Sequence, residues 1–113
     1  MKSHAIVIAD TSGAIQFWSE GAASLFGIPQ QDALGKKVDI IIPAEYRDMH
    51  WAGFNKAMAT GIAGEEGSFF DAPIHVRGET RMFRGQLHVL RNESKNAIGA
   101  MAIFTLPAGS PTP

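Results

Sequence analysis

The chain begins with two short apolar runs separated by a polar turn. Residues 5–9 read Ala-Ile-Val-Ile-Ala and residues 14–18 read Ala-Ile-Gln-Phe-Trp, with Asp-Thr-Ser-Gly at 10–13 between them. β-Branched and aromatic runs that flank a turn of this composition are typical of a β-hairpin. The pattern therefore predicts two antiparallel strands at the start of the chain.

Helical spacing follows the hairpin. Ser19 can cap a short helix over 20–26 through its hydroxyl, and Gly27 can end that helix. Further short helical turns are expected near 30–34 and 38–41.

The longest helix is predicted over residues 43–60, where a proline suits the first turn and a glycine follows the last residue. One side of this helix carries an apolar stripe that includes a single imidazole. Its members are Tyr46, Met49, His50, Gly53, Phe54 and Ala57. Trp51 falls at the edge of the stripe, so Phe54 is expected to contribute more to stability than Trp51.

Beyond residue 67 the spacing changes from that of a helix to the alternation of strands. Residues 69–76 alternate, and Pro73 among them indicates an edge strand or an irregular one. Within 80–90 the large apolar residues share one face with Gly85, a position that leaves space on the inner surface or marks a bulge. Residues 97–106 form a last apolar strand.

Two strands, a block of helices and three strands define the fold class. Strands joined by tight turns run antiparallel, and the helices between them must cover one face of the sheet. The sequence predicts an α+β fold: a five-stranded antiparallel sheet, with the helices inserted between the second and third strands and packed on one face.

Composition limits the remaining possibilities. The 113 residues are 45% hydrophobic and 19% charged, which suits one globular domain, expected over 1–106, followed at 107–113 by a flexible Pro-rich tail or the start of a linker. The net charge of −1 and the lack of a basic cluster predict no nucleic-acid or membrane partner. Without an apolar run of about 18 residues or a signal peptide, the expected location is the cytoplasm.

The chain contains no cysteine. This excludes disulfides, thiolate metal sites and cysteinyl-flavin photochemistry. The sequence also has no recognisable nucleophile–base arrangement and no phosphate-binding loop, so an enzyme is not expected.

Several motifs in order resemble a PAS domain over about residues 5–106. They are Asp-Thr-Ser-Gly-Ala-Ile at 10–15, Phe-Trp-Ser-Glu-Gly-Ala-Ala at 17–23, Leu-Phe-Gly at 25–27, Gly-Lys-Lys-Val at 35–38 and Ile-Ile-Pro at 41–43. Ser19 stands where the family commonly has asparagine. The resemblance implies a sensory or protein-interaction module that holds haem, flavin, a metabolite or nothing against its sheet.

The segment Ile-Pro-Ala-Glu-Tyr-Arg-Asp-Met-His at 42–50, with Phe54 and Ala-Thr-Gly at 59–61, is similar to a helix of the haem-PAS oxygen-sensing histidine kinases. This resemblance implies haem b, with His50 as the proximal iron ligand, and sensing of a diatomic gas or redox state. Residues expected to surround the haem are Tyr46, Met49, His50, Phe54, Phe69, Phe70, Leu87 and Val89. The implied partners are a small-molecule or gas ligand and a second copy of the chain or an effector domain.

Two departures from those kinases affect the expected chemistry. Their distal arginine would fall near Phe69 or Phe70, which are apolar, so polar stabilisation of oxygen is not expected and carbon monoxide or nitric oxide suits the site better. Met82 could be a sixth ligand, but strand alternation places it with Arg84 on the opposite face from Phe83.

Other interpretations remain open at this point. His50 could have a structural role, with its nitrogens bonded to a backbone carbonyl or to water. The domain could be a ligand-free module for dimerisation or protein interaction, or it could bind another small planar molecule such as a flavin or a metabolite.

Overall fold

Five strands form one antiparallel sheet in the computed structural model, which describes residues 4–106. The strands are β1 (His4–Asp10), β2 (Ile15–Trp18), β3 (Phe69–Val76), β4 (Glu79–Arg91) and β5 (Ala97–Thr105), in the spatial order β2-β1-β5-β4-β3. The first and last strands of the chain are therefore neighbours at the centre. β3 lies at an edge of the sheet, which explains why Pro73 is tolerated there.

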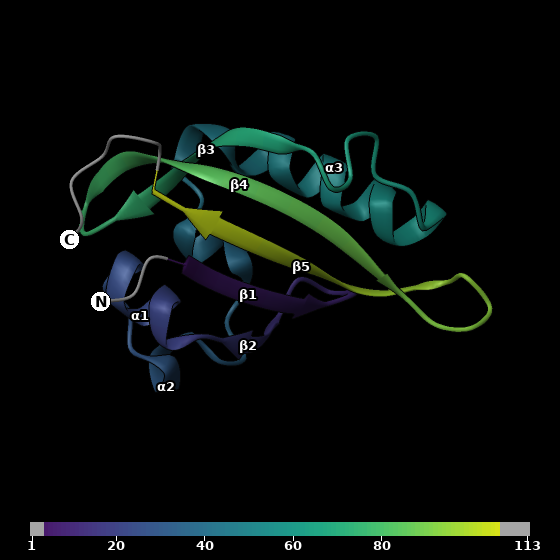
Figure 1. Ribbon diagram of the computed structural model, residues 1–113, viewed down its shortest axis with the longest axis horizontal. Helices are drawn as coiled ribbons and strands as arrows, with labels where there is room; N and C mark the ends of the chain where they lie inside the picture. The colour runs from purple at the N-terminus through teal and green to yellow at the C-terminus, as the bar shows by residue number, and fades with distance from the viewer. Residues whose placement is uncertain (1–3, 107–113) are drawn as a thin grey trace.

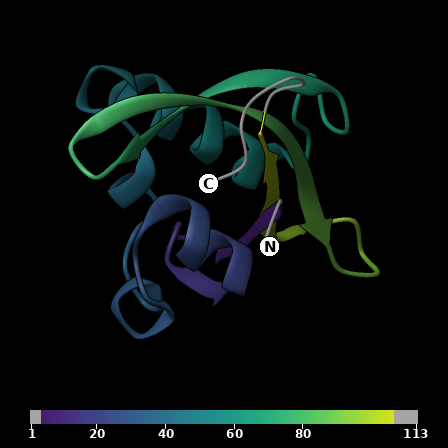
Figure 2. The ribbon, with the colours of Figure 1, turned by 60° about the vertical axis from the view of Figure 1, so that its left-hand side comes forward.

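The helical elements all lie between β2 and β3 in the chain, as predicted. They are α1 (Glu20–Phe26), α2 (Gln30–Ala33), the 3₁₀ turns η1 (Val38–Ile41) and η2 (Ala44–Tyr46), and α3 (Arg47–Thr60). Figure 1 shows their arrangement, and in Figure 2 the long strand β4 arches over α3 with the helices on the concave side. The α+β prediction is confirmed, whereas the predicted tail at 107–113 lies outside the described residues.

The predicted helix over 43–60 is divided in two. Its first residues form η2, and the α-helix begins only at Arg47. The end of the helix is as predicted, because Gly61 adopts a left-handed φ of 74° and its N–H bonds the carbonyl of Ala57.

Helix α1 lies directly on β1. Ser19 caps the helix by accepting a hydrogen bond from Ala22 N at 3.1 Å, and the same hydroxyl oxygen accepts from Ile6 N at 2.9 Å. Gly21 makes the close approach possible, since a Cβ atom there would lie 1.5 Å from the carbonyl oxygen of His4. Gly27 ends the helix with φ 73°, as the sequence predicts.

The aromatic core lies beneath α1. Phe26 makes edge-to-face contacts with Trp18, Phe83 and Phe104, with ring centroids 5.2–5.8 Å apart. The first three of these four rings are at most 1% exposed. Elsewhere on the same face of the sheet, Phe70 and Leu87 are covered less completely.

Candidate functional site

The inward face of α3 overlaps the predicted stripe only in part, because His50, Phe54 and Ala57 lie on it whereas Tyr46, Met49 and Gly53 are exposed. Ala57 is its buried residue, with His50, Trp51, Phe54 and Met58 half-buried, whereas Met49 is 70% exposed. Tyr46, in the preceding 3₁₀ turn, is 39% exposed. The prediction that Tyr46 and Met49 face a haem pocket therefore disagrees with the burial pattern of the helix.

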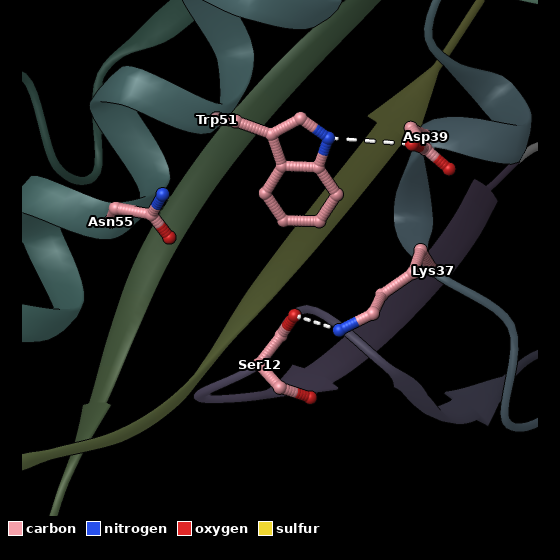
Figure 3. Close-up of a pocket in the computed structure, with 5 residues that line it drawn as sticks. All are labelled: Ser12, Lys37, Asp39, Trp51 and Asn55. Atoms are coloured by element: carbon pink, nitrogen blue, oxygen red, sulfur yellow. Dashed lines mark hydrogen bonds between the residues drawn. The ribbon is translucent and has the colours of Figure 1, made fainter.

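Trp51 sets the orientation of α3. Its indole packs against the core and lies over Gly13, where a Cβ atom would come within 2.4 Å of the ring. Its Nε1 donates a hydrogen bond to Asp39 Oδ2 at 3.3 Å (Figure 3). Burying the large Trp51 ring, whose N–H has a hydrogen-bond partner, stabilises the fold more than burying Tyr46 and Met49 would. The Trp51 side of the helix therefore faces inward.

We expect Trp51→Ala to cost about 2–3 kcal/mol of unfolding free energy, below the range of about 3–5 kcal/mol for truncating a fully buried aromatic residue, because Trp51 is half-buried. Phe54→Ala should cost less, because a phenylalanine side chain is smaller than that of tryptophan and has no N–H group to donate a hydrogen bond like the one from Trp51 to Asp39. Urea unfolding of the two variants measures the order. A larger loss for Phe54→Ala would restore the order expected from the sequence. Trp51→Phe is the matched control, since it keeps most of the apolar surface and removes the bond to Asp39.

A shallow open hollow of about 380 Å³ lies between α3, η1 and the β1–β2 turn. Its lining residues are Ser12, Lys37, Asp39, Trp51 and Asn55 (Figure 3). Lys37 Nζ donates to the backbone oxygen of Ser12 at 2.6 Å, and Trp51 donates to Asp39. Both contacts join separate segments of the chain, which indicates a packing role for this hollow.

His50 lies beside Trp51 on the inward side of α3. Its ring is edge-to-face with Trp51 at 4.9 Å between centroids and is stacked on Phe54 at 6.0 Å with an interplanar angle of 23°. The Nδ1 atom is buried and has no hydrogen-bond partner. Burial lowers the pKa of His50 from its usual value, against the opposing charge of Asp39.

These features make His50 an incompletely satisfied base. The lowered pKa favours the neutral ring at pH 7, and a neutral ring has one nitrogen with a free lone pair. A buried polar atom without a partner costs about 1–3 kcal/mol. A ligand that formed a bond with this nitrogen would recover that free energy. The unpaired nitrogen is therefore an argument for a ligand site at His50.

The predicted sheet residues divide between the two faces. Phe70, Leu87 and Val89 have the inward parity of β3 and β4, whereas Phe69 lies on the outer face beneath the guanidinium of Arg84, 4.4 Å from its ring centroid. The expectation that Phe69 lines the same pocket as Phe70 is therefore wrong, because adjacent strand residues point to opposite faces. Met82 is also on the outer face and 50% exposed, as its alternation predicts.

Two inward residues of the sheet remain accessible. Phe70 is 36% exposed and Leu87 is 42% exposed, although Val89 on the same face is only 7% exposed. Gly85 lies opposite Phe70 without a register shift between β3 and β4, so this glycine leaves space and does not mark a bulge. The concave face thus presents uncovered apolar side chains, with His50 and Phe54 on the inward side of α3.

A polar latch that no sequence pattern predicted joins the end of α3 to β4. Arg91 Nε donates to the carbonyl of Gly61 at 2.8 Å, and its guanidinium pairs with Glu66. Glu66 Oε2 also accepts from Val89 N at 2.8 Å. The latch residues are distant in sequence, and no local pattern indicates that they meet.

The latch should depend on pH through Glu66. Arg91 and the Val89 amide lower the pKa of Glu66, so the latch stabilises the fold above the ordinary Glu pKa and is lost as pH falls through the lowered folded value. We expect Glu66→Gln to speed amide exchange in residues 61–68 at pH 7. The difference from wild type should shrink with acidification, and a difference that persists at low pH would contradict a charge-dependent latch.

Chelation by several side chains is not seen among residues 4–106. In that range no group of three or more His, Asp or Glu residues is placed to hold a metal ion. None of the helices there is both long and apolar enough to cross a membrane.

Comparison with known proteins identifies the fold family. The sequence matches the family model for the PAS fold over residues 3–105. It is also 38% identical over 124 aligned positions to an uncharacterised protein of Azorhizobium caulinodans, covering 93% of this chain and 17% of that protein. The chain therefore spans about a sixth of the length of this relative.

Solved structures share the architecture at low sequence identity. The PAS domain of a Colwellia psychrerythraea protein superposes with a TM-score of 0.77 at 18% identity, over 95% of this chain and 88% of that one. The PAS domain of the Cronobacter turicensis quorum-sensing receptor RpfR, solved in complex with C12:0, gives 0.75 at 16% identity, over 96% and 97%. The superpositions show a shared fold, and the family match over nearly the whole chain shows that it belongs to the PAS family of sensory and signalling domains.

Proposed function

We propose that this chain is a sensory PAS domain that binds haem b, with His50 as the axial ligand of the iron. The observation that carries the proposal is the buried Nδ1 of His50, which has no hydrogen-bond partner in a ring whose pKa is lowered. A neutral imidazole with an available lone pair is the form that ligates metals.

The surrounding residues fit this group. Within residues 4–106, no cluster of chelating side chains accompanies His50. The other ligands of an iron bound at His50 would therefore have to come with it, such as the four nitrogens of a porphyrin. Phe54 stacks on the imidazole, and the accessible Leu87 offers apolar surface to a flat ring system. When bound, haem iron supplies a site for a diatomic gas.

The residues available on the sheet side favour gases that need no hydrogen bond. Phe70 and Leu87 carry no donor, so carbon monoxide or nitric oxide is preferred over oxygen at this site. The protein would report the gas through a population shift that moves α3 and the sheet, without catalysis. Arg91 joins the end of α3 to β4, so the latch is one route for this shift. We expect the receiver to be a second copy of the chain or an effector domain.

A second candidate ligand is an apolar chain that ends in a carboxyl group. It is favoured by the inward-facing but accessible Leu87 and Phe70, together with the likeness to the PAS domain solved with C12:0. In this case His50 would accept a hydrogen bond from the protonated acid. The same unpaired nitrogen would serve either ligand.

The deciding experiment is titration of the purified protein with haemin, followed by absorption, and with dodecanoic acid and flavin mononucleotide, followed by calorimetry. Saturable uptake of one haemin with a shifted, sharpened Soret band supports haem. A spectrum of free haemin alone overturns it, and binding of dodecanoic acid then supports the second candidate. If none of these ligands binds, the domain is better explained as a ligand-free interaction module.

A further inference from the structure

The inner surface of the sheet has a flat floor at Gly85. This glycine lies opposite Phe70 in β3 and opposite Phe104 in β5, and Phe83 and Leu87 flank it along β4, so its missing side chain leaves a gap between larger ones. Ala72 lies beside it, Ala102 is opposite Leu87, and Ala100 is opposite Val89. The flat ring of Phe70 already fills the gap at Gly85, so the gap favours a planar ligand that lies against β4 in its place.

Phe70 covers this floor. A Cβ atom at position 85 would lie 2.9 Å from Phe70 Cζ, 3.1 Å from Phe70 Cε1 and 3.3 Å from Ala72 Cβ. The ring therefore occupies the space that the missing side chain leaves. Any flat molecule that reaches β4 at this point has to displace the ring.

The ring of Phe70 is held less firmly than the aromatic rings of the core. It is 36% exposed, whereas Phe26 and Phe83 are each 1% exposed. Ring–ring contacts join Phe26 to its neighbours in the core, whereas the ring of Phe70 lies over Gly85, which has no side chain. Moving Phe70 off the floor therefore disturbs fewer contacts than moving a core aromatic.

We propose that Phe70 is a gate that determines ligand specificity: its ring closes the Gly85 floor in the free protein and moves aside for a planar macrocycle, which takes its place against β4. The proposal rests on the proposed function, because it concerns the same concave site. It predicts that this site prefers flat ring systems to flexible chains. An alkyl chain, which is not flat, gains little from the floor.

The competing explanation is that Phe70 only packs. An aromatic ring across from a strand glycine can compensate for the missing side chain and stabilise the sheet, with no role in binding. The two explanations differ for a planar probe. Removing the ring improves binding if Phe70 is a gate, and it leaves binding unchanged or weaker if Phe70 only supports the sheet.

The test uses metal-free protoporphyrin IX, because this probe needs no iron ligand. Binding is followed by porphyrin fluorescence for wild type, Phe70→Ala, Gly85→Ala and the matched control Phe69→Ala, whose ring lies on the outer face of the same strand. We expect Phe70→Ala to bind about tenfold more tightly and Gly85→Ala about tenfold more weakly, each a change of about 1.4 kcal/mol. Phe69→Ala should leave the affinity unchanged.

Further variants separate a gate from a folding defect. Phe70→Leu retains apolar bulk without the flat ring, and it should bind the porphyrin with an affinity between wild type and Phe70→Ala. The double variant Phe70→Ala/Gly85→Ala removes the clash with the ring but keeps a methyl group on the floor, so it should still bind more weakly than Phe70→Ala alone. Equal affinities across these variants, or no porphyrin binding by any of them, would overturn the gate.

A His50→Ala variant keeps this inference separate from the haem proposal. Protoporphyrin affinity that responds to Phe70 and Gly85 but not to His50 supports the floor, whatever the iron ligand is. Haemin uptake that depends on His50 without any response to Phe70 or Gly85 supports the axial ligand and rejects the gate.

Discussion

Gly21→Ala is expected to be the most damaging addition of a single methyl group to this domain, at about 3 kcal/mol of unfolding free energy. The new Cβ would lie 1.5 Å from the carbonyl oxygen of His4 and 2.7 Å from its carbonyl carbon. Both are backbone atoms of a strand in the sheet, so no flexible side chain can move aside. Helix α1 would have to lift from β1, which would loosen the packing of its last residue, Phe26, against the aromatic core.

Gly53→Ala provides the matched control for this substitution. Gly53 is exposed within α3, and no heavy atom would lie within 4 Å of its new Cβ. Alanine loses less conformational entropy than glycine on entering a helix, so this variant should gain about 0.5–1 kcal/mol. Urea unfolding followed by tryptophan fluorescence measures both changes. The same sign for the two would show that helix propensity, and not contact with β1, governs position 21.

Local signals in the sequence were sufficient for the elements. The Ser19 cap, the Gly27 and Gly61 ends and the alternation in β4 each depend on neighbouring residues, and each is found where it was predicted. The order of the strands in the sheet could not be predicted from such local signals. Pairing of β1 with β5 joins the two ends of the described chain, and strand periodicity alone does not specify a partner.

The orientation of α3 could not be obtained from periodicity. The predicted stripe extended the helical phase back to Tyr46, which lies in a 3₁₀ turn where that phase no longer holds. The decisive contacts of Trp51 are with Gly13 and Asp39, both distant in sequence. The predicted stripe placed His50 and Phe54 correctly on the inward side of α3, but it also placed Met49 there, and Met49 is exposed.

The sheet side of the site illustrates the same limit. Alternation correctly gave the shared face of Leu87 and Val89, and it also places Phe69 and Phe70 on opposite faces, so expecting both in one pocket went against it. The exposure of Leu87 depends on how far α3 covers the sheet, which is a property of the whole packing.

The apo protein should tolerate loss of the His50 ring. His50 Nδ1 makes no hydrogen bond, so removing the ring breaks none at that atom and also removes a buried polar group. We expect urea unfolding of ligand-free His50→Gly to show a loss of at most about 1–2 kcal/mol, because the ring is only half-buried and the glycine itself costs about 1 kcal/mol.

Haem binding, in contrast, should depend on His50 strongly. Changing an outer partner of a metal ligand costs about 10–100-fold in affinity, so removing the ligand itself should cost at least about 100-fold. Added imidazole can enter the space left in His50→Gly and restore the Soret band, which an indirect structural effect would not allow. His75→Ala, on the outer face of β3, is the control and should bind haemin like wild type. Unaltered haemin affinity and an unaltered spectrum in His50→Gly would assign the iron to another residue.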